Sequence, residues 1–218
     1  MPLDIKICGL NTPAALAAAL DGGATHVGFI FFPKSPRHLS PADAGALRQA
    51  ARGRARAVAV TVDADNAALD AIVAALAPDM LQMHGGETPE RVAAVKARFG
   101  LPVMKAFSLR QAGDLDRAAG YRGVADQLLF DAKPPEGADL PGGNGVRFDW
   151  RILAGYEHPF FLSGGLNAGN VAEALLLTRP AGLDVSSGVE SAPGVKDAGL
   201  IKTFLTAARA AQADARAA

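Results

Sequence analysis

The segments PFFLSGGL (159–166) and AGLDVSSGVE (181–190) decide how the fold of this chain is interpreted. Each begins as a short apolar run, which is typical of a buried strand, and ends in small residues. The residues between them, 167–178, predict a helix with Asn167 as its N-cap. Two strands that are joined by a helix lie parallel in one sheet, so both segments should end at the same edge.

The small residues at these strand ends, Gly164-Gly165 and Ser186-Ser187-Gly188, predict an anion site. Glycine lets a ligand approach backbone N–H groups closely, and serine adds hydroxyl donors. A (β/α)8 barrel commonly binds phosphate with the loops after its seventh and eighth strands. The alternative is a pair of ordinary tight turns, but the matching positions of the donors favour a phosphate site.

Strand patterns and helix patterns alternate along the rest of the chain. In the first strand, period-two alternation places Lys6 and Cys8 on one face and Ile5 and Ile7 on the other. The expected strands before the two quoted segments are 3–8, 26–32, 55–62, 80–84, 102–107 and 127–131. Besides 167–178, the expected helices are 14–20 after the N-cap Thr12, 41–51 after the N-cap Ser40, 65–77, 88–99, 111–119, 148–154 and 197–211.

This alternation predicts an α/β fold, a single closed (β/α)8 TIM barrel with a phosphate site after strands 7 and 8. An open, doubly wound sheet is the alternative, but the first strand is not followed by the G-x-G-x-x-G pattern of a dinucleotide-binding fold. No change of composition divides the chain, so we expect one domain over 1–218, with a tail from about residue 212 that frays. The long loop 132–146 is expected to be functional.

Bulk composition excludes several classes of protein. The chain has 218 residues with 22 basic and 22 acidic side chains, so nothing points to nucleic acid or to an anionic membrane as a partner. A single cysteine cannot form an internal disulfide and fits a reducing cytoplasm. The four histidines show no metal-ligand spacing, and the N-terminus shows no secretory pattern. We therefore expect a soluble cytoplasmic protein without a metal or cofactor.

Reactive side chains of a barrel enzyme come from the carboxyl ends of strands and the loops that follow. Cys8 ends the first strand, where Lys6 on the same face would favour the thiolate; the alternative is a small buried thiol. Asp131 ends the sixth strand and is either a partner of Cys8 in proton transfer or a structural cap. Free thiols are mostly protonated at neutral pH and free carboxyls mostly ionised, so acid–base work by this pair requires shifted pKa values or minority forms.

Three further residues at the same edge are candidates for binding. Arg37 is either a clamp for a second anion, because arginine binds carboxylates bidentately, or a solvated surface residue. His84 follows the fourth strand and is either a ligand contact or a loop residue. Asp184 could hold a sugar hydroxyl or tie its own loop. The residues alone thus predict a barrel enzyme that acts on a phosphorylated small molecule.

The motifs together resemble the phosphoribosylanthranilate isomerase family of tryptophan biosynthesis. The resemblance covers nearly the whole chain and is carried by Lys6–Leu10, Ser35–Arg37, Leu81–Gly85, Phe130-Asp131, Gly142–Gly145, Phe148–Trp150, Leu162–Leu166 and Asp184–Glu190. There are two departures: Asn144–Arg147 stands where the family often has threonine and lysine, and Met83 replaces a leucine.

The resemblance implies an Amadori rearrangement of N-(5-phosphoribosyl)anthranilate to 1-(2-carboxyphenylamino)-1-deoxyribulose 5-phosphate, without a cofactor. It implies that Asp131 is the general acid that opens the ring and that Cys8 is the general base that removes the C2 proton. It implies that Arg37 holds the anthranilate carboxylate and that the glycine and serine turns hold the phosphate.

Two alternatives stay open at this point. The first is another barrel enzyme on a phosphorylated intermediate, such as an indole-glycerol-phosphate synthase relative or the histidine-pathway aminoaldose isomerase; the latter uses aspartate where this chain has Cys8. The second is a barrel that senses phosphorylated ligands without turnover. We expect a monomer, with a homodimer as the alternative.

Overall fold

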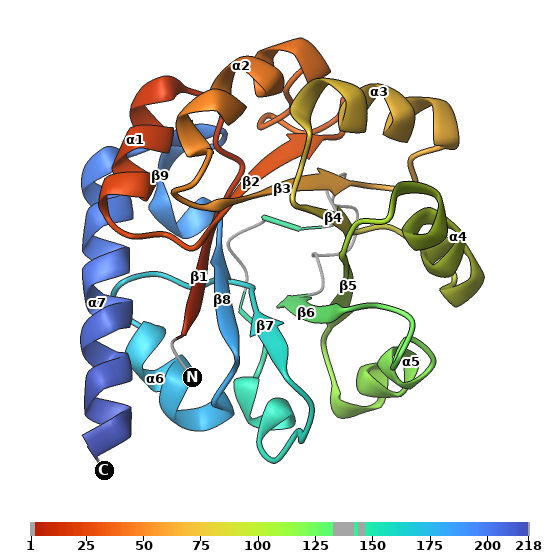
Figure 1. Cartoon of the computed structure of the whole chain (residues 1–218). Helices are drawn as coiled ribbons and strands as arrows, with labels where there is room; N and C mark the ends of the chain where they lie inside the picture. The colour runs from red at the N-terminus through yellow and green to blue at the C-terminus, as the bar shows by residue number, and fades with distance from the viewer. Residues whose placement is uncertain (1–2, 133–141, 144–146, 218) are drawn as a thin grey trace.

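The computed structural model describes residues 3–132, 142–143 and 147–217. Eight parallel strands close into a barrel in chain order, and β1 pairs with both β2 and β8 (Figure 1). The strands are β1 Asp4–Cys8, β2 His26–Phe31, β3 Arg56–Thr61, β4 Met80–Met83, β5 Val103–Leu109, β6 Gln127–Ala132, β7 Phe160–Leu162 and β8 Gly182–Val185. The predicted TIM barrel is confirmed. The alternative of an open, doubly wound sheet is excluded because the eight strands close into a barrel.

Helices form a layer around the strands, and α7 packs against both α1 and α6, which brings the last helix beside the first (Figure 1). The helices are α1 Pro13–Asp21, α2 Pro41–Ala51, α3 Asn66–Leu76, α4 Pro89–Phe99, α5 Asp116–Ala119, α6 Val171–Thr178 and α7 Ala198–Ala217. Three short 3₁₀ segments, η1 Ala112–Leu115, η2 Trp150–Leu153 and η3 Ser187–Val189, and a hairpin of β9 Glu190–Ala192 and β10 Val195–Lys196 complete the described chain.

The helix starts follow the predicted capping chemistry. Thr12 and Ser40 each accept a hydrogen bond from the backbone N–H three residues later, and proline occupies the first helical position after both. A capping oxygen satisfies an N–H group that has no partner inside the helix, and proline lacks the N–H that would otherwise be unpaired there. These two helices therefore begin where the sequence predicts.

The helix predicted at 167–178 begins later than expected. Its first residue is Val171, and Asn167 is not its cap, because Asn167 Oδ1 accepts from Gly169 N at 2.8 Å in a local turn. Asn170 instead ties this turn together: its side chain accepts from Asn167 N and donates to Gly165 O, both at 2.8 Å. Asparagine side chains bond nearby backbone as readily in turns as in caps, which explains the error.

Two other segments also differ from expectation. The helix predicted at 148–154 is the single 3₁₀ turn η2. The last helix, predicted at 197–211, is α7 and extends to Ala217, because alanine and arginine are strong helix formers. Most of the loop 132–146 lies outside the described residues, and its described members are Ala132, Gly142 and Gly143.

The barrel interior and the layer between strands and helices form two separate cores. As the alternation predicts, Cys8 lies in the interior core, while Ile5 and Ile7 belong to the outer one. The apolar members of the interior core are Val58, Val60, Met80, Met104, Ala106, Leu129 and Phe161. The inward-facing positions nearest the carboxyl ends of the strands carry the polar residues described below.

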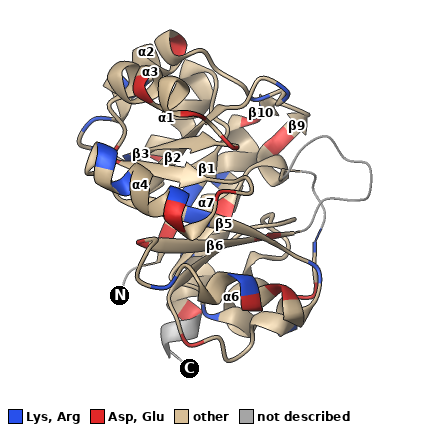
Figure 2. Ribbon diagram, turned by 90° about the vertical axis from the view of Figure 1, so that its right-hand side faces the viewer, with Lys and Arg blue, Asp and Glu red and all other residues tan. Residues whose placement is uncertain are grey.

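Charges outside the barrel are balanced. Acidic and basic residues are interspersed over the surface elements (Figure 2), and pairs such as Lys96–Asp126 and Arg98–Asp70 are both separated by 2.6 Å. Such exposed pairs contribute little to stability individually. Within the described residues, no helix is long and apolar enough to cross a membrane.

Candidate active site

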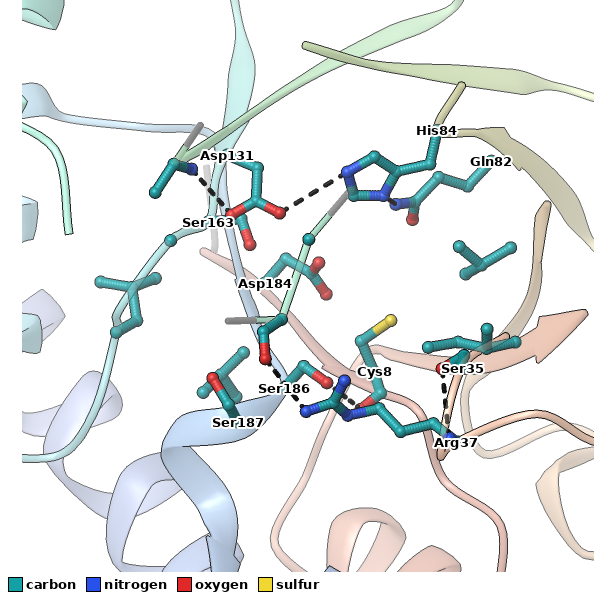
Figure 3. Close-up of a pocket in the computed structure, with 18 of the residues that line it drawn as sticks. Cys8, Ser35, Arg37, Gln82, His84, Asp131, Ser163, Asp184, Ser186 and Ser187 are labelled. Atoms are coloured by element: carbon teal, nitrogen blue, oxygen red, sulfur yellow. Dashed lines mark hydrogen bonds and ion pairs between the residues drawn. The ribbon is translucent and has the colours of Figure 1, made fainter. Parts of the chain in front are cut away.

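One pocket opens at the carboxyl ends of the strands, and every residue predicted to act in catalysis or binding lines it. These residues are Cys8, Arg37, His84, Asp131, Gly164, Gly165, Asp184, Ser186, Ser187 and Gly188. The side chains of Cys8 and Asp131 enter the pocket from opposite walls, and Asp184 lies between them (Figure 3). The barrel thus brings together residues that lie far apart in the sequence.

Cys8 lies in a buried polar cluster at the end of β1. Lys6 Nζ donates to Asp184 Oδ1 at 2.8 Å, and both side chains are buried. Burial raises the pKa of the Cys8 thiol and outweighs the Lys6 ammonium, which acts in the opposite direction. The net shift is therefore opposite to the one that Lys6 alone would produce, and the thiol is protonated in the free protein at neutral pH.

Asp131 near the end of β6 is a buried carboxyl with a strongly shifted pKa. Its Oδ1 accepts from Ala132 N at 2.8 Å, and its Oδ2 lies 3.5 Å from His84 Nε2. Burial, followed by the charge of Asp184, raises the pKa of Asp131 to about 7. A carboxyl with this pKa is about half protonated at neutral pH, so the shift required of a general acid is present.

His84, directly after β4, is a neutral imidazole. Burial lowers the pKa of His84 to about 3, and the positive charges of Lys105 and Lys6 add to this effect. His84 Nδ1 lies 3.2 Å from Nε2 of Gln82, and His84 Nε2 has no hydrogen-bond partner within the described part of the chain. If the Gln82 amide donates to Nδ1, the ring proton resides on Nε2, which faces Asp131.

Arg37 lies in the loop after β2, and its main hydrogen-bond partner is the carboxylate of Glu190. Arg37 Nε and Nη2 donate to the two carboxylate oxygens of Glu190 at 2.7 and 2.8 Å, and Nη2 also donates to Gly143 O at 3.1 Å. The stem of Arg37 passes over Gly9, where a Cβ would lie 2.7 Å from Arg37 Cδ. Arg37 is therefore not a solvated surface residue. Glu190 occupies the edge formed by Nε and Nη2, so this edge cannot bind a ligand carboxylate bidentately.

The turns after β7 and β8 lie against each other, as the opening segments predict. A Cβ at Gly188 would collide with the backbone oxygen of Leu166, so only glycine permits this contact. Gly164 and Gly165 have positive φ angles of 90° and 67°. Their backbone N–H groups have no acceptor among the described residues, so both are available to an anion.

The sequence pointed less directly to three polar groups of this pocket and its walls. Gln82 and Ser163 line the pocket at the ends of β4 and β7. Glu190 does not line the pocket, and its hydrogen bonds to Arg37 connect it to the site. Within the described residues, no group of three His, Cys, Asp or Glu side chains is placed to hold a metal ion.

Comparison with known proteins gives one consistent result. Residues 5–207 match the model of the family described as N-(5'phosphoribosyl)anthranilate (PRA) isomerase. An N-(5'-phosphoribosyl)anthranilate isomerase of Mesorhizobium japonicum is 66% identical over 216 residues, which cover 98% of this chain and 99% of the relative.

Solved structures agree. Phosphoribosyl anthranilate isomerase from Thermotoga maritima is 33% identical with a TM-score of 0.85, covering 96% of this chain and 100% of that one. A phosphoribosyl anthranilate isomerase in complex with reduced 1-(o-carboxyphenylamino)-1-deoxyribulose 5-phosphate is 32% identical with a TM-score of 0.84 and the same coverage.

Proposed function

The chain belongs to the N-(5'-phosphoribosyl)anthranilate isomerase family, and from this premise we propose which residues of the pocket carry the reaction. The protein is an aldose–ketose isomerase of tryptophan biosynthesis. It converts the aminoaldose N-(5'-phosphoribosyl)anthranilate into 1-(2-carboxyphenylamino)-1-deoxyribulose 5-phosphate. The roles below are proposals for this chain's own residues.

Asp131 is the general acid. The reaction begins when a proton is transferred to the furanose ring oxygen, which breaks the bond from that oxygen to C1 and leaves an iminium ion. A pKa of about 7 gives Asp131 both a populated acid form and a real driving force for donation at neutral pH. The neutral His84 beside it faces the carboxylate that forms, and an N–H on its Nε2 would stabilise that product.

Cys8 is the general base. The iminium withdraws electrons from C2, so its proton becomes acidic enough to be removed by a thiolate, which gives an enolamine that tautomerises to the ketone. Because burial raises the pKa of Cys8, the free protein supplies the thiolate only as a minority form. The positive charge of Lys6, and that of the iminium once the ring opens, favour this form.

The two ends of the substrate bear anionic groups, and the pocket offers donors for both. The Gly164-Gly165 turn and Ser186, Ser187 and Gly188 would bind the phosphate through backbone N–H groups and hydroxyls. Arg37 Nη1, which has no hydrogen-bond partner among the described residues, would meet the carboxylate of the anthranilate ring. Asp184, between the acid and the base, would accept from a hydroxyl of the sugar.

The observation that supports this assignment best is a protonatable carboxyl and a thiol on opposite walls of one pocket. The test is to follow conversion of N-(5'-phosphoribosyl)anthranilate by purified parent, Cys8→Ser and Asp131→Asn proteins. We expect both variants to lose nearly all turnover while they still bind the reduced product. Parent-like turnover by either variant would remove that residue from its role.

We propose further that the protein acts as a monomer in the cytoplasm. Few large apolar side chains are exposed among the described residues: Leu176, Val195 and Leu200. The Thermotoga maritima isomerase is described as dimeric, so a homodimer is the alternative. Light scattering over a range of concentrations distinguishes the two. The single cysteine supports a reducing compartment, which localisation of the tagged protein would test.

A further inference from the structure

The β9–β10 hairpin follows the turn after β8 (Figure 2), and it carries two buried charged side chains. They are Glu190 at the start of β9 and Lys196 at the end of β10, with 4% and 0% of the side chain exposed. Neither lines the pocket. Burying ionised groups costs free energy unless they are paired, so a function for this pair has to be found in what it contacts.

Glu190 holds one edge of Arg37 completely. Its two oxygens accept from Arg37 Nε and Nη2, Lys196 Nζ lies 2.5 Å from Oε1, and Gly194 N donates to Oε2 at 3.3 Å. Nη2 of Arg37 also donates to Gly143 O. Nη1 is therefore the nitrogen of Arg37 whose N–H groups have no acceptor among the described residues.

Lys196 connects the same cluster to the other end of the site. Its ammonium donates to Ser186 O at 2.9 Å and to Ser186 Oγ at 3.2 Å. Ser186 Oγ in turn donates to the backbone oxygen of Cys8 at 3.1 Å. A continuous chain of hydrogen bonds therefore joins the arginine, the turn after β8 and the end of β1.

The cluster is also unbalanced in charge. Arg37 and Lys196 are two cations, and Glu190 is one carboxylate whose pKa is lowered because these two partners outweigh its burial. A single net positive charge thus remains beside the pocket. A carboxylate on the substrate would neutralise it, and an uncharged ring would not.

We propose that Glu190 and Lys196 are positioning residues for substrate selection: Glu190 fixes Arg37 so that Nη1 meets the substrate carboxylate, and Lys196 fixes the Ser186 turn. This rests on the proposed role of Arg37. The pair would make the enzyme prefer aminoaldoses whose amine carries an ortho carboxylate. An arginine held in advance loses less conformational freedom when it binds, which is how a buried partner improves affinity.

The test compares two ligands by titration calorimetry. One is reduced 1-(o-carboxyphenylamino)-1-deoxyribulose 5-phosphate, and the other is the same compound without the carboxylate. Glu190→Gln is expected to weaken the first ligand roughly tenfold, the cost of ordering one freed side chain, and the second less than about twofold. In an Arg37→Ala background, Glu190→Gln should have no further effect on either ligand.

Two more variants separate positioning from simple charge. Glu190→Gln raises the net charge of the cluster and Lys196→Met lowers it, so a pure charge effect would move affinity for the carboxylated ligand in opposite directions. Positioning predicts a loss in both. The Glu190→Gln/Lys196→Met double variant restores the original net charge and should still lose roughly tenfold, which keeps the test valid if removal of Glu190 alone prevents folding.

The control is Lys96→Met, which breaks the exposed pair with Asp126 and should change neither affinity. Equal losses for both ligands in Glu190→Gln, or tighter binding of the carboxylated ligand by that variant, would overturn the proposal. If Arg37→Ala itself fails to reduce the preference for the carboxylated ligand, the proposed role of Arg37 is wrong as well. If only the Glu190 and Lys196 variants leave the preference unchanged, this inference alone fails.

Discussion

Replacing Asp131 by asparagine should make the folded protein more stable above neutral pH while it abolishes turnover. Burial raises the pKa of Asp131 from 3.8 to about 7, so the folded protein keeps a proton that the unfolded chain releases between these values. The free energy of unfolding of the parent therefore falls as pH rises through this window. At about 1.36 kcal/mol per pKa unit, the full cost approaches ~4 kcal/mol above pH 7.

Asparagine cannot ionise, so the variant avoids this cost. The side-chain oxygen of the asparagine still accepts from Ala132 N, but its NH2 group would face His84 Nε2. This poorer contact should lower the free energy of unfolding by about 1–2 kcal/mol. The variant should then be more stable than the parent by about 2–3 kcal/mol at pH 8, and less stable by about 1–2 kcal/mol at pH 4, where the parent carboxyl is neutral.

Chemical denaturation followed by circular dichroism at intervals from pH 4 to pH 8.5 measures this difference directly. Asp214→Asn, which removes an exposed carboxylate of α7, is the matched control for the loss of one carboxylate. A constant difference between parent and Asp131→Asn over the whole range would refute the reasoning, because it would mean that Asp131 is ionised in the folded protein at neutral pH.

Three more outcomes are expected. Arg37→Ala should lose about 1.5–3 kcal/mol of affinity for the reduced carboxylated product and much less for the analogue without the carboxylate, by calorimetry; equal losses would exclude the clamp. Ser187→Asp should raise the Michaelis constant about tenfold or more by repelling the phosphate, with the thermal midpoint as a folding control; an unchanged constant would remove the phosphate from this turn. Burial lowers the pKa of His26 to about 4, so this residue gains a proton on unfolding below pH 6.5. His26→Leu should therefore reduce the loss of stability between pH 6.5 and pH 4 by about 2–3 kcal/mol. An unchanged pH dependence would show that His26 is not buried as a neutral ring.

Gly164→Asp would also bring a carboxylate into the predicted phosphate site, but it is unsuitable as a test. In the structure a Cβ at Gly164 would lie 2.5 Å from Ala132 N, and its φ angle of 90° is strained for other residues. Lost activity would then report on folding as much as on phosphate, whereas Ser187 has an ordinary side chain that already lines the pocket.

The fold was predictable because its signals are local and repeat. Each strand carries its own apolar pattern, and caps such as Thr12 and Ser40 act within one turn of the helix they start. The prediction for Asn167 was wrong because the backbone N–H donors that its side chain can bond in a turn and in a helix cap lie equally close in sequence. Candidate residues of the site were also predictable, since strand ends of a barrel converge on one mouth.

Partners of those residues were not predictable from the sequence. Arg37 and Glu190 are 153 positions apart, and no local pattern pairs them. The pKa of Cys8 depends chiefly on the opposing effects of burial and the charge of Lys6, and only the packed structure shows which is larger. Sequence patterns therefore located the chemistry, while distances and burial decided protonation and charge.

The rate of a single turnover by Cys8→Ser protein tests the proposed base most directly. The protein is mixed in excess with N-(5'-phosphoribosyl)anthranilate, and affinity for the reduced product is measured separately to show that the pocket is intact. The proposed role predicts a rate about 10²–10⁴ times lower than that of the parent with nearly unchanged affinity, because a serine hydroxyl is a far poorer base than a thiolate. A Cys8→Ser protein that binds and turns over like the parent would contradict it.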